Sequence, residues 1–198
     1  MEDVNQIIDD TRTHNLEYID LSFLDLQTLP DKLFSLENLK IISISGNKLT
    51  SLPPEVQKWT LLEELYMRDN QIEFLPEEVK YWTSLHELEC QNNQITSLPS
   101  GIQGWSSIEY LNLDNNRLTV LPPQVKGWTS LIALYIANQQ IEFPIQVVYW
   151  HSIRYIREGN DFDYVQNGKS GIALFLRQRV FYRQFPQYYE KLRDYWTK

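Results

Sequence analysis

The chain has little cysteine, little positive charge and no long hydrophobic run. Cys90 is the only cysteine among 198 residues, so no disulfide forms within the chain and a reducing compartment is expected. The 18 Lys and Arg residues against 26 Asp and Glu residues leave a net charge of -8, which argues against nucleic acid or an anionic membrane as partner. The longest apolar run is seven residues (131–137), whereas a membrane-spanning helix needs about 20.

The N-terminal sequence, Met1-Glu2-Asp3, has neither the basic start nor the apolar stretch of a secretory signal. We therefore expect a cytoplasmic protein, with export as a bacterial effector by another route as the alternative. Hydrophobic residues make up 42% of the chain and aromatic residues 13%, which is enough for a sizeable core. This composition excludes a disordered or collagen-like chain, and the length fits about one domain.

A 23-residue repeat runs through most of the sequence. One column of the repeat consists of Asn47, Asn70, Asn93 and Asn116, followed by Gln139. An aliphatic column consists of Ile42, Leu65, Leu88, Leu111 and Leu134. Further columns of aliphatic residues, proline and tryptophan keep the same period. The repeat indicates seven strand-like segments joined by six linking segments.

Apolar residues within each unit are spaced as in a short, half-buried strand, for example Leu62, Leu65 and Met67. A strand this short must pair with its copy one repeat away, so parallel pairing in register would stack the inward side chains as columns. The Asn column falls where the chain turns off each strand. Because an amide side chain both donates and accepts hydrogen bonds, these residues are expected to form a structural ladder that satisfies buried backbone groups.

The segment from Leu85 to Asn93 carries the pattern LxxLxLxxN and continues through Gln94 to Leu98-Pro99. Over residues 16 to 161 the chain resembles the 23-residue class of leucine-rich repeat proteins, found in Ras-associated signalling scaffolds and in many bacterial proteins. The resemblance implies a right-handed α/β solenoid with a parallel β-sheet on its concave face, short α or 3-10 turns on its convex face and helical caps. It also implies a non-enzymatic scaffold or adaptor that binds a protein partner.

The linking segments begin at Leu-Pro and place an aliphatic residue three positions before each tryptophan. That spacing is one helical turn, so we expect brief α or 3-10 turns with the tryptophans packed inward. Leu36 occupies the tryptophan column in the preceding unit. The alternative is that the tryptophans form an exposed binding stripe.

Three segments are expected: an N-terminal cap helix over residues 1–15, leucine-rich repeats over 16–161 and a C-terminal helical cap over 162–198. Val4, Ile7, Ile8 and Thr11 give the first segment a helical apolar face. Residues 1 to 161 hold 11 basic and 23 acidic side chains, whereas 162 to 198 hold 7 basic and 3 acidic ones. An alternative function is therefore a regulatory or structural part of a larger assembly that acts through the basic C-terminal helices. The other interpretation of these helices is an ordinary end cap.

The outward positions of the strands vary freely, whereas the core columns are uniform, and aromatic and Arg residues are common in binding hot spots. The candidate partner-binding residues are Tyr18, Glu64, Tyr66, Arg68, Glu87, Glu89, Tyr110, Asn112, Asp114, Tyr135, Tyr155 and Arg157. The acids among them favour a protein partner of basic character. We expect the chain itself to be a monomer. The alternative is a solvated surface with incidental tyrosines.

Three patterns resemble chemical motifs but lack a necessary part. Gly168-Lys169-Ser170 lacks the first glycine of a phosphate-binding loop, because Asp163 stands there. The segment from His86 to Cys90 has Cys where a zinc protease has its second His, and Cys90 belongs to a core column. The four acids of the central repeats lack the spacing of a calcium-binding loop. These acids are Glu64, Glu87, Glu89 and Asp114. We therefore expect no catalytic residue, metal or cofactor.

Overall fold

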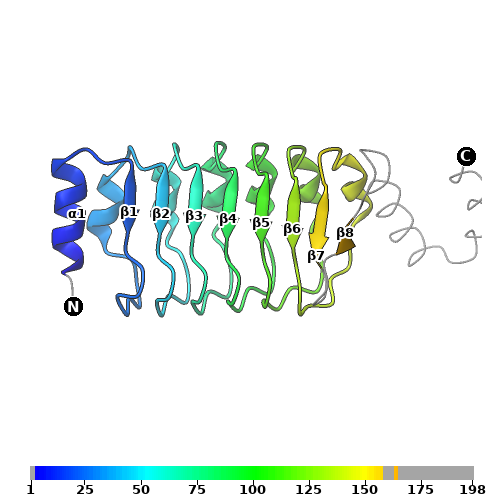
Figure 1. Cartoon of the computed structure of the whole chain (residues 1–198), viewed down its shortest axis with the longest axis horizontal. Helices are drawn as coiled ribbons and strands as arrows, with labels where there is room; N and C mark the ends of the chain where they lie inside the picture. The colour runs from blue at the N-terminus through cyan, green and yellow to red at the C-terminus, as the bar shows by residue number, and fades with distance from the viewer. Residues whose placement is uncertain (1–2, 158–162, 165–198) are drawn as a thin grey trace, which may run out of the picture.

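The computed structural model describes residues 3–157 and 163–164, in which seven short parallel strands alternate with six 3-10 helices. The strands are β1 (Tyr18–Asp20), β2 (Ile41–Ser43), β3 (Glu64–Tyr66), β4 (Glu87–Glu89), β5 (Tyr110–Asn112), β6 (Ala133–Tyr135) and β7 (Tyr155–Arg157). The helices are η1 (Asp31–Ser35), η2 (Pro54–Lys58), η3 (Glu77–Tyr81), η4 (Ser100–Gly104), η5 (Pro123–Gly127) and η6 (Ile145–Tyr149). Figure 1 shows the strands side by side in one open row.

Each strand pairs with the next in chain order, and each residue lies opposite its copy one repeat away, as in Leu65 opposite Leu88. The middle residue of every strand is buried, because successive side chains of a strand point to opposite faces of the sheet. The seven parallel strands and the six linking segments predicted from the repeat are therefore confirmed.

The tryptophans form a continuous buried column beside the 3-10 helices. This confirms the prediction that they pack inward, and it excludes the exposed binding stripe. The column consists of Trp59, Trp82, Trp105, Trp128 and Trp150. Neighbouring rings stack with centroids 5.8–6.3 Å apart. Phe34 continues the stack at 5.5 Å from Trp59, although the sequence places Leu36 in that column. A leucine has no ring to stack on an indole, and Phe34 in η1 supplies one instead.

Two glycines let η3 and η4 approach each other closely. A Cβ at Gly101 would stand 2.5 Å from the carbonyl oxygen of Glu77, and one at Gly104 would stand 2.5 Å from that of Lys80. Glu77 adds to this contact, because its carboxylate accepts hydrogen bonds from the backbone N–H groups of Ser100 and Gly101. These contacts hold the 3-10 side of the central repeats together.

Helix α1 (Val4–Thr13) lies before β1, within the segment for which the sequence predicts a helix. It contacts β1 and η1, with Ile8 and Thr11 buried. Its role as an end cap stays a prediction. At the other end, Asp163–Tyr164 form a short strand, β8, that pairs antiparallel with β7. The rest of the predicted C-terminal cap lies outside the described residues. Within the described part of the chain, no helix is long and apolar enough to cross a membrane.

Candidate functional site

The candidate site is the solvent-facing side of the sheet, which we call the sheet face and define as the first and third residues of β1–β7. The first residues stand in register as Tyr18, Ile41, Glu64, Glu87, Tyr110, Ala133 and Tyr155. The third residues stand in register as Asp20, Ser43, Tyr66, Glu89, Asn112, Tyr135 and Arg157. The 3-10 helices lie behind the sheet, so they leave this face uncovered (Figure 1).

Three carboxylates and one tyrosine cluster on β3 and β4. Glu64 lies opposite Glu87, and Tyr66 lies opposite Glu89. The hydroxyl of Tyr66 donates a hydrogen bond of 2.6 Å to Oε2 of Glu64. Partial burial raises the pKa of Tyr66 well above its ordinary value, and the bond to Glu64 and the charges of the other acids add to the shift.

Like charges that lie close together on a sheet are unfavourable, and Glu87 faces two such charges, Glu64 and Glu89. Partial burial raises the pKa of Glu87, the charges of Glu64 and Glu89 raise it further, and His86 partly opposes them. Nε2 of His86 lies 3.7 Å from Oε1 of Glu64. No ion pair among the described residues includes Glu87 or Glu89, so the cluster keeps an excess of negative charge.

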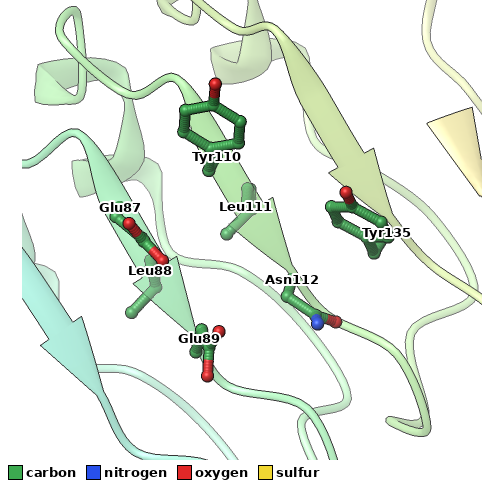
Figure 2. A pocket seen from close by; sticks show the side chains of 7 residues that line it. All are labelled: Glu87, Leu88, Glu89, Tyr110, Leu111, Asn112 and Tyr135. Atoms are coloured by element: carbon green, nitrogen blue, oxygen red, sulfur yellow. The ribbon is translucent and has the colours of Figure 1, made fainter. Parts of the chain in front are cut away.

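A pocket of about 280 Å³ opens beside this cluster, over β5 (Figure 2). Its lining residues are Glu87, Leu88, Glu89, Tyr110, Leu111, Asn112 and Tyr135. The buried Leu88 and Leu111 mark its floor, where the chain runs through the middle of β4 and β5. The polar lining side chains belong to the sheet face and project from β4, β5 and β6.

The structure brings some of the sequence-predicted site residues together and keeps others apart. Five of them line the pocket: Glu87, Glu89, Tyr110, Asn112 and Tyr135. Glu64 and Tyr66 adjoin it through β3, and Arg68 follows on the same chain segment. Tyr18 on β1 and Tyr155 on β7 stand at opposite ends of the row of parallel strands, so one small partner does not reach both.

Asp114 does not have the outward, accessible position that the sequence pattern predicts. It is only 5% exposed. Its carboxylate accepts a hydrogen bond from the backbone N–H of Ala137 and lies 3.4 Å from Nη1 of Arg157. The physical reason is these two contacts and not its position in the repeat, because Arg68 stands at the equivalent position after β3 and is exposed. Ala133, Ala137 and Ser45, also in the predicted outward columns, are buried as well.

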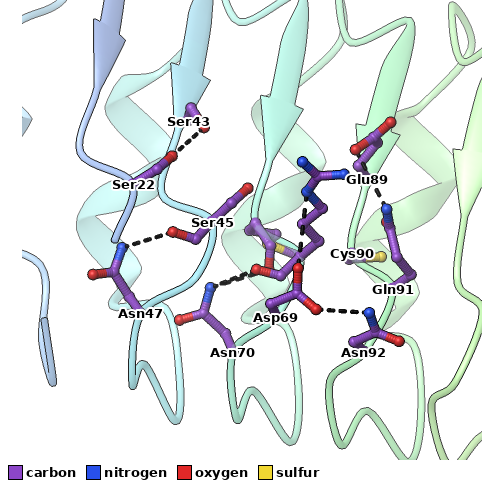
Figure 3. Close-up of polar contacts among 12 residues, drawn as sticks. Ser22, Ser43, Ser45, Asn47, Asp69, Asn70, Glu89, Cys90, Gln91 and Asn92 are labelled. Carbon is purple, nitrogen blue, oxygen red and sulfur yellow. Dashed lines mark hydrogen bonds and ion pairs between the residues drawn. The ribbon is translucent and has the colours of Figure 1, made fainter. Parts of the chain in front are cut away.

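The Asn column lies at the turns that follow the strands (Figure 3). It bonds to backbone groups of its own repeat and of the preceding one. Nδ2 of Asn70 donates to the carbonyl oxygens of Ile44 at 3.0 Å and Met67 at 3.2 Å, and Oδ1 accepts from the backbone N–H of Leu49 at 3.1 Å. Equivalent bonds are made by Asn47, Asn93 and Asn116. Each of these buried side chains links its own repeat to the preceding one.

A second, exposed ladder was not predicted. Asp69, Asn92, Asn115 and Asn138 directly precede the buried column and have positive φ values of 53–62°. Each asparagine donates to the side chain one repeat earlier, as Asn92 does to Asp69 at 2.6 Å (Figure 3). The signal in the sequence is the recurrence of Asp and Asn, which tolerate the left-handed conformation, at the repeat interval.

The described residues offer little for catalysis or metal binding. No group of three or more His, Cys, Asp and Glu side chains in residues 3–157 and 163–164 is arranged to hold a metal ion. Cys90 is fully buried, its Sγ donates to the carbonyl oxygen of Asn112 at 3.2 Å, and burial raises its pKa. A thiol in that state is a poor nucleophile.

Known protein structures share this architecture. The chain is similar to the internalin InlF of Listeria monocytogenes, with 20% identity and a TM-score of 0.66 over 81% of this chain and 47% of that one. It is also similar to the leucine-rich repeat domain of the type III effector XopL, with 21% identity and a TM-score of 0.72 over 78% and 55%. A leucine-rich repeat protein of Leptospira interrogans gives 17% identity and a TM-score of 0.50 over 91% and 62%.

At these identities the likeness shows the fold alone, and the chain covers less than two thirds of each of these three structures. No curated protein sequence matches the chain. The family model for leucine-rich repeats matches residues 14–72 and 60–118, which together make up more than half of the chain. The chain therefore belongs to the leucine-rich repeat family.

Proposed function

We propose that this chain is a protein-binding module whose partner docks on the sheet face. Leucine-rich repeat domains typically bind other proteins and are generally non-enzymatic. The observation that carries the proposal is the contrast between the two sides of the strands. The middle residues are uniformly Ile or Leu, whereas the sheet face mixes Tyr, Glu, Asp, Asn, Ser and Arg with the apolar Ile41 and Ala133. Packing accounts for the first set of residues and leaves the second unexplained.

The composition of the sheet face suits a protein surface. Tyr18, Tyr110 and Tyr155 are substantially exposed, and tyrosine is enriched in binding hot spots because its ring buries a large area and its hydroxyl hydrogen-bonds. Glu87 and Glu89 form no ion pair within residues 3–157 and 163–164, which favours a partner with basic character. Because solvent-exposed charges are screened by salt, binding should weaken as ionic strength rises.

The test is a pull-down that compares the wild type with a Tyr66→Ala/Tyr135→Ala double variant, in a lysate of the organism that encodes the chain. The matched control is Tyr81→Ala/Tyr149→Ala, which removes two exposed tyrosines from η3 and η6 on the opposite side of the solenoid. A partner that is retained by the control variant and lost by the sheet-face variant supports the proposal. Equal recovery of every partner by all three proteins contradicts it.

A further inference from the structure

The pocket over β5 has two chemically different walls. Glu87 and Glu89 project from β4 on one side, and the rings of Tyr110 and Tyr135 project from β5 and β6 (Figure 2). Asn112 lies between them, in register with both Glu89 and Tyr135. Its Oδ1 accepts a hydrogen bond of 3.1 Å from the backbone N–H of Asp114, which holds the amide in place. One wall is therefore anionic and the other aromatic.

The charge of the anionic wall is only partly offset among the described residues, by His86. Glu64 shares its oxygens with Tyr66 and His86, at 2.6 and 3.7 Å, whereas Glu87 and Glu89 take part in no ion pair. The amide of Gln91 reaches Oε2 of Glu89 at only 3.4 Å. Two adjacent carboxylates beside a partly desolvated hollow attract a cation more strongly than the same groups in open water do.

The volume of the pocket limits what it accepts. At about 280 Å³ it lies just below the ~300–1,000 Å³ that is usual for small-molecule sites. A second pocket, of about 380 Å³, lies among η4, η5 and η6, but Lys126 is the only charged residue in its lining. The pocket over β5 is therefore suited to one cationic side chain, and the second pocket is not.

We propose that the pocket over β5 receives a single arginine side chain of the protein partner, an inference that rests on the proposed function. Arginine fits both walls, because its planar guanidinium stacks on tyrosine rings and directs several N–H donors toward carboxylates. Lysine carries the same charge, but its compact, strongly hydrated ammonium has no plane to stack and no fork of donors. The pocket should therefore discriminate between the two cations.

The test is an NMR titration of the 15N-labelled full chain with N-acetyl-arginine methylamide. N-acetyl-lysine methylamide serves as the second probe, at matched ionic strength. We expect the arginine probe to shift the backbone amides of residues 87–89, 110–112 and 135, with an affinity about fivefold above that of the lysine probe. Shifts that are equal for the two probes, or that lie outside these residues, would overturn the proposal.

Two pairs of variants separate the walls. Glu87→Gln/Glu89→Gln should weaken arginine binding about tenfold, whereas the control Glu55→Gln/Glu78→Gln, on η2 and η3, should leave it unchanged. Tyr135→Leu should remove the preference for arginine over lysine, and Tyr135→Phe should keep it, because the ring provides the stacking surface. Arginine binding that survives loss of both carboxylates would contradict the proposal.

The outcomes also separate this inference from the proposed function. If the arginine probe fails to bind but the sheet-face variant still loses its partner in the pull-down, the arginine pocket is wrong and the protein-binding face stands. If the probe binds and no partner depends on Tyr66 and Tyr135, the proposed function is wrong, and with it the assignment of the pocket to a partner protein.

Discussion

The ring of Phe23 lies directly over Gly46, so that a Cβ on the glycine would stand 2.3 Å from Cδ1 and Cε1 of the ring. Both residues belong to the exposed ladder position and have positive φ values, 58° and 65°. From Asp69 onward the same position holds Asp or Asn, whose side chains bond to each other across repeats. At the first two repeats a ring packed on a glycine replaces that polar contact.

Gly46→Ala should lower the free energy of unfolding by about 1–2 kcal/mol, the cost of the left-handed conformation for a residue with a Cβ. The exposed ring of Phe23 moves aside, so the backbone provides most of the loss. Urea denaturation measures the effect. In the control, Gly46→Asn should cost less, because asparagine tolerates this conformation. Equal stability of the wild type and the alanine variant would show that the positive φ at residue 46 carries no cost for a residue with a Cβ.

Asn70→Ala should lower the free energy of unfolding by about 1–3 kcal/mol, because the carbonyl groups of Ile44 and Met67 and the N–H of Leu49 lose their buried partner. Thermal and urea denaturation provide the measurement. Asn92→Gly is the matched control: it removes an exposed amide of the outer ladder, keeps the left-handed backbone and should cost less than about 0.5 kcal/mol. A null effect of Asn70→Ala would count against the buried ladder as a source of stability.

Trp82→Phe should be more destabilising than Trp59→Phe by about 1 kcal/mol. Both rings are fully buried and stacked, but only Trp82 donates from Nε1 to a carbonyl oxygen, that of Val56 at 3.0 Å. Nε1 of Trp59 is buried without a hydrogen-bond partner, so its removal leaves no acceptor unpaired. Chemical denaturation of the two variants gives the comparison, and an equal loss would mean that the indole bonds add nothing to stability.

Glu87→Gln should stabilise the protein at pH 7 by less than about 1 kcal/mol, and the gain should vanish at pH 4. The folded-state pKa of Glu87 is raised above its ordinary 4.5, so the folded state binds the proton more tightly than the unfolded state does. Protonation of Glu87 therefore stabilises the folded state. This stabilisation is complete below pH 4.5 and is lost as the pH rises through the raised pKa. Urea midpoints at both pH values measure this. A glutamine variant less stable than the wild type at pH 7 would contradict the cost assigned to burying this carboxylate beside Glu64 and Glu89.

Much of the fold could be predicted because a repeat sorts side chains by period. A column that is aliphatic in every unit, such as that of Leu65 and Leu88, can only be stacked core, and this sets the register of the whole sheet. The candidate pocket could be predicted in part for the same reason. Once the register is known, Glu89, Asn112 and Tyr135 must be neighbours. The pocket between them could not be predicted, because it depends on the orientation of the side chains in the folded protein.

The sequence by itself determined the seven parallel strands, the inward tryptophans and the identity of the face that meets solvent, since each follows from period and polarity within one unit. Only the tertiary structure decided contacts that differ between units. Asp114 is buried by its bond to Ala137 and its ion pair with Arg157, and Trp59 has a buried N–H group without a partner. The physical reason is that a hydrogen bond forms or fails when the distance between two atoms changes by a few tenths of an ångström. The residue types in a column do not record such differences between repeats.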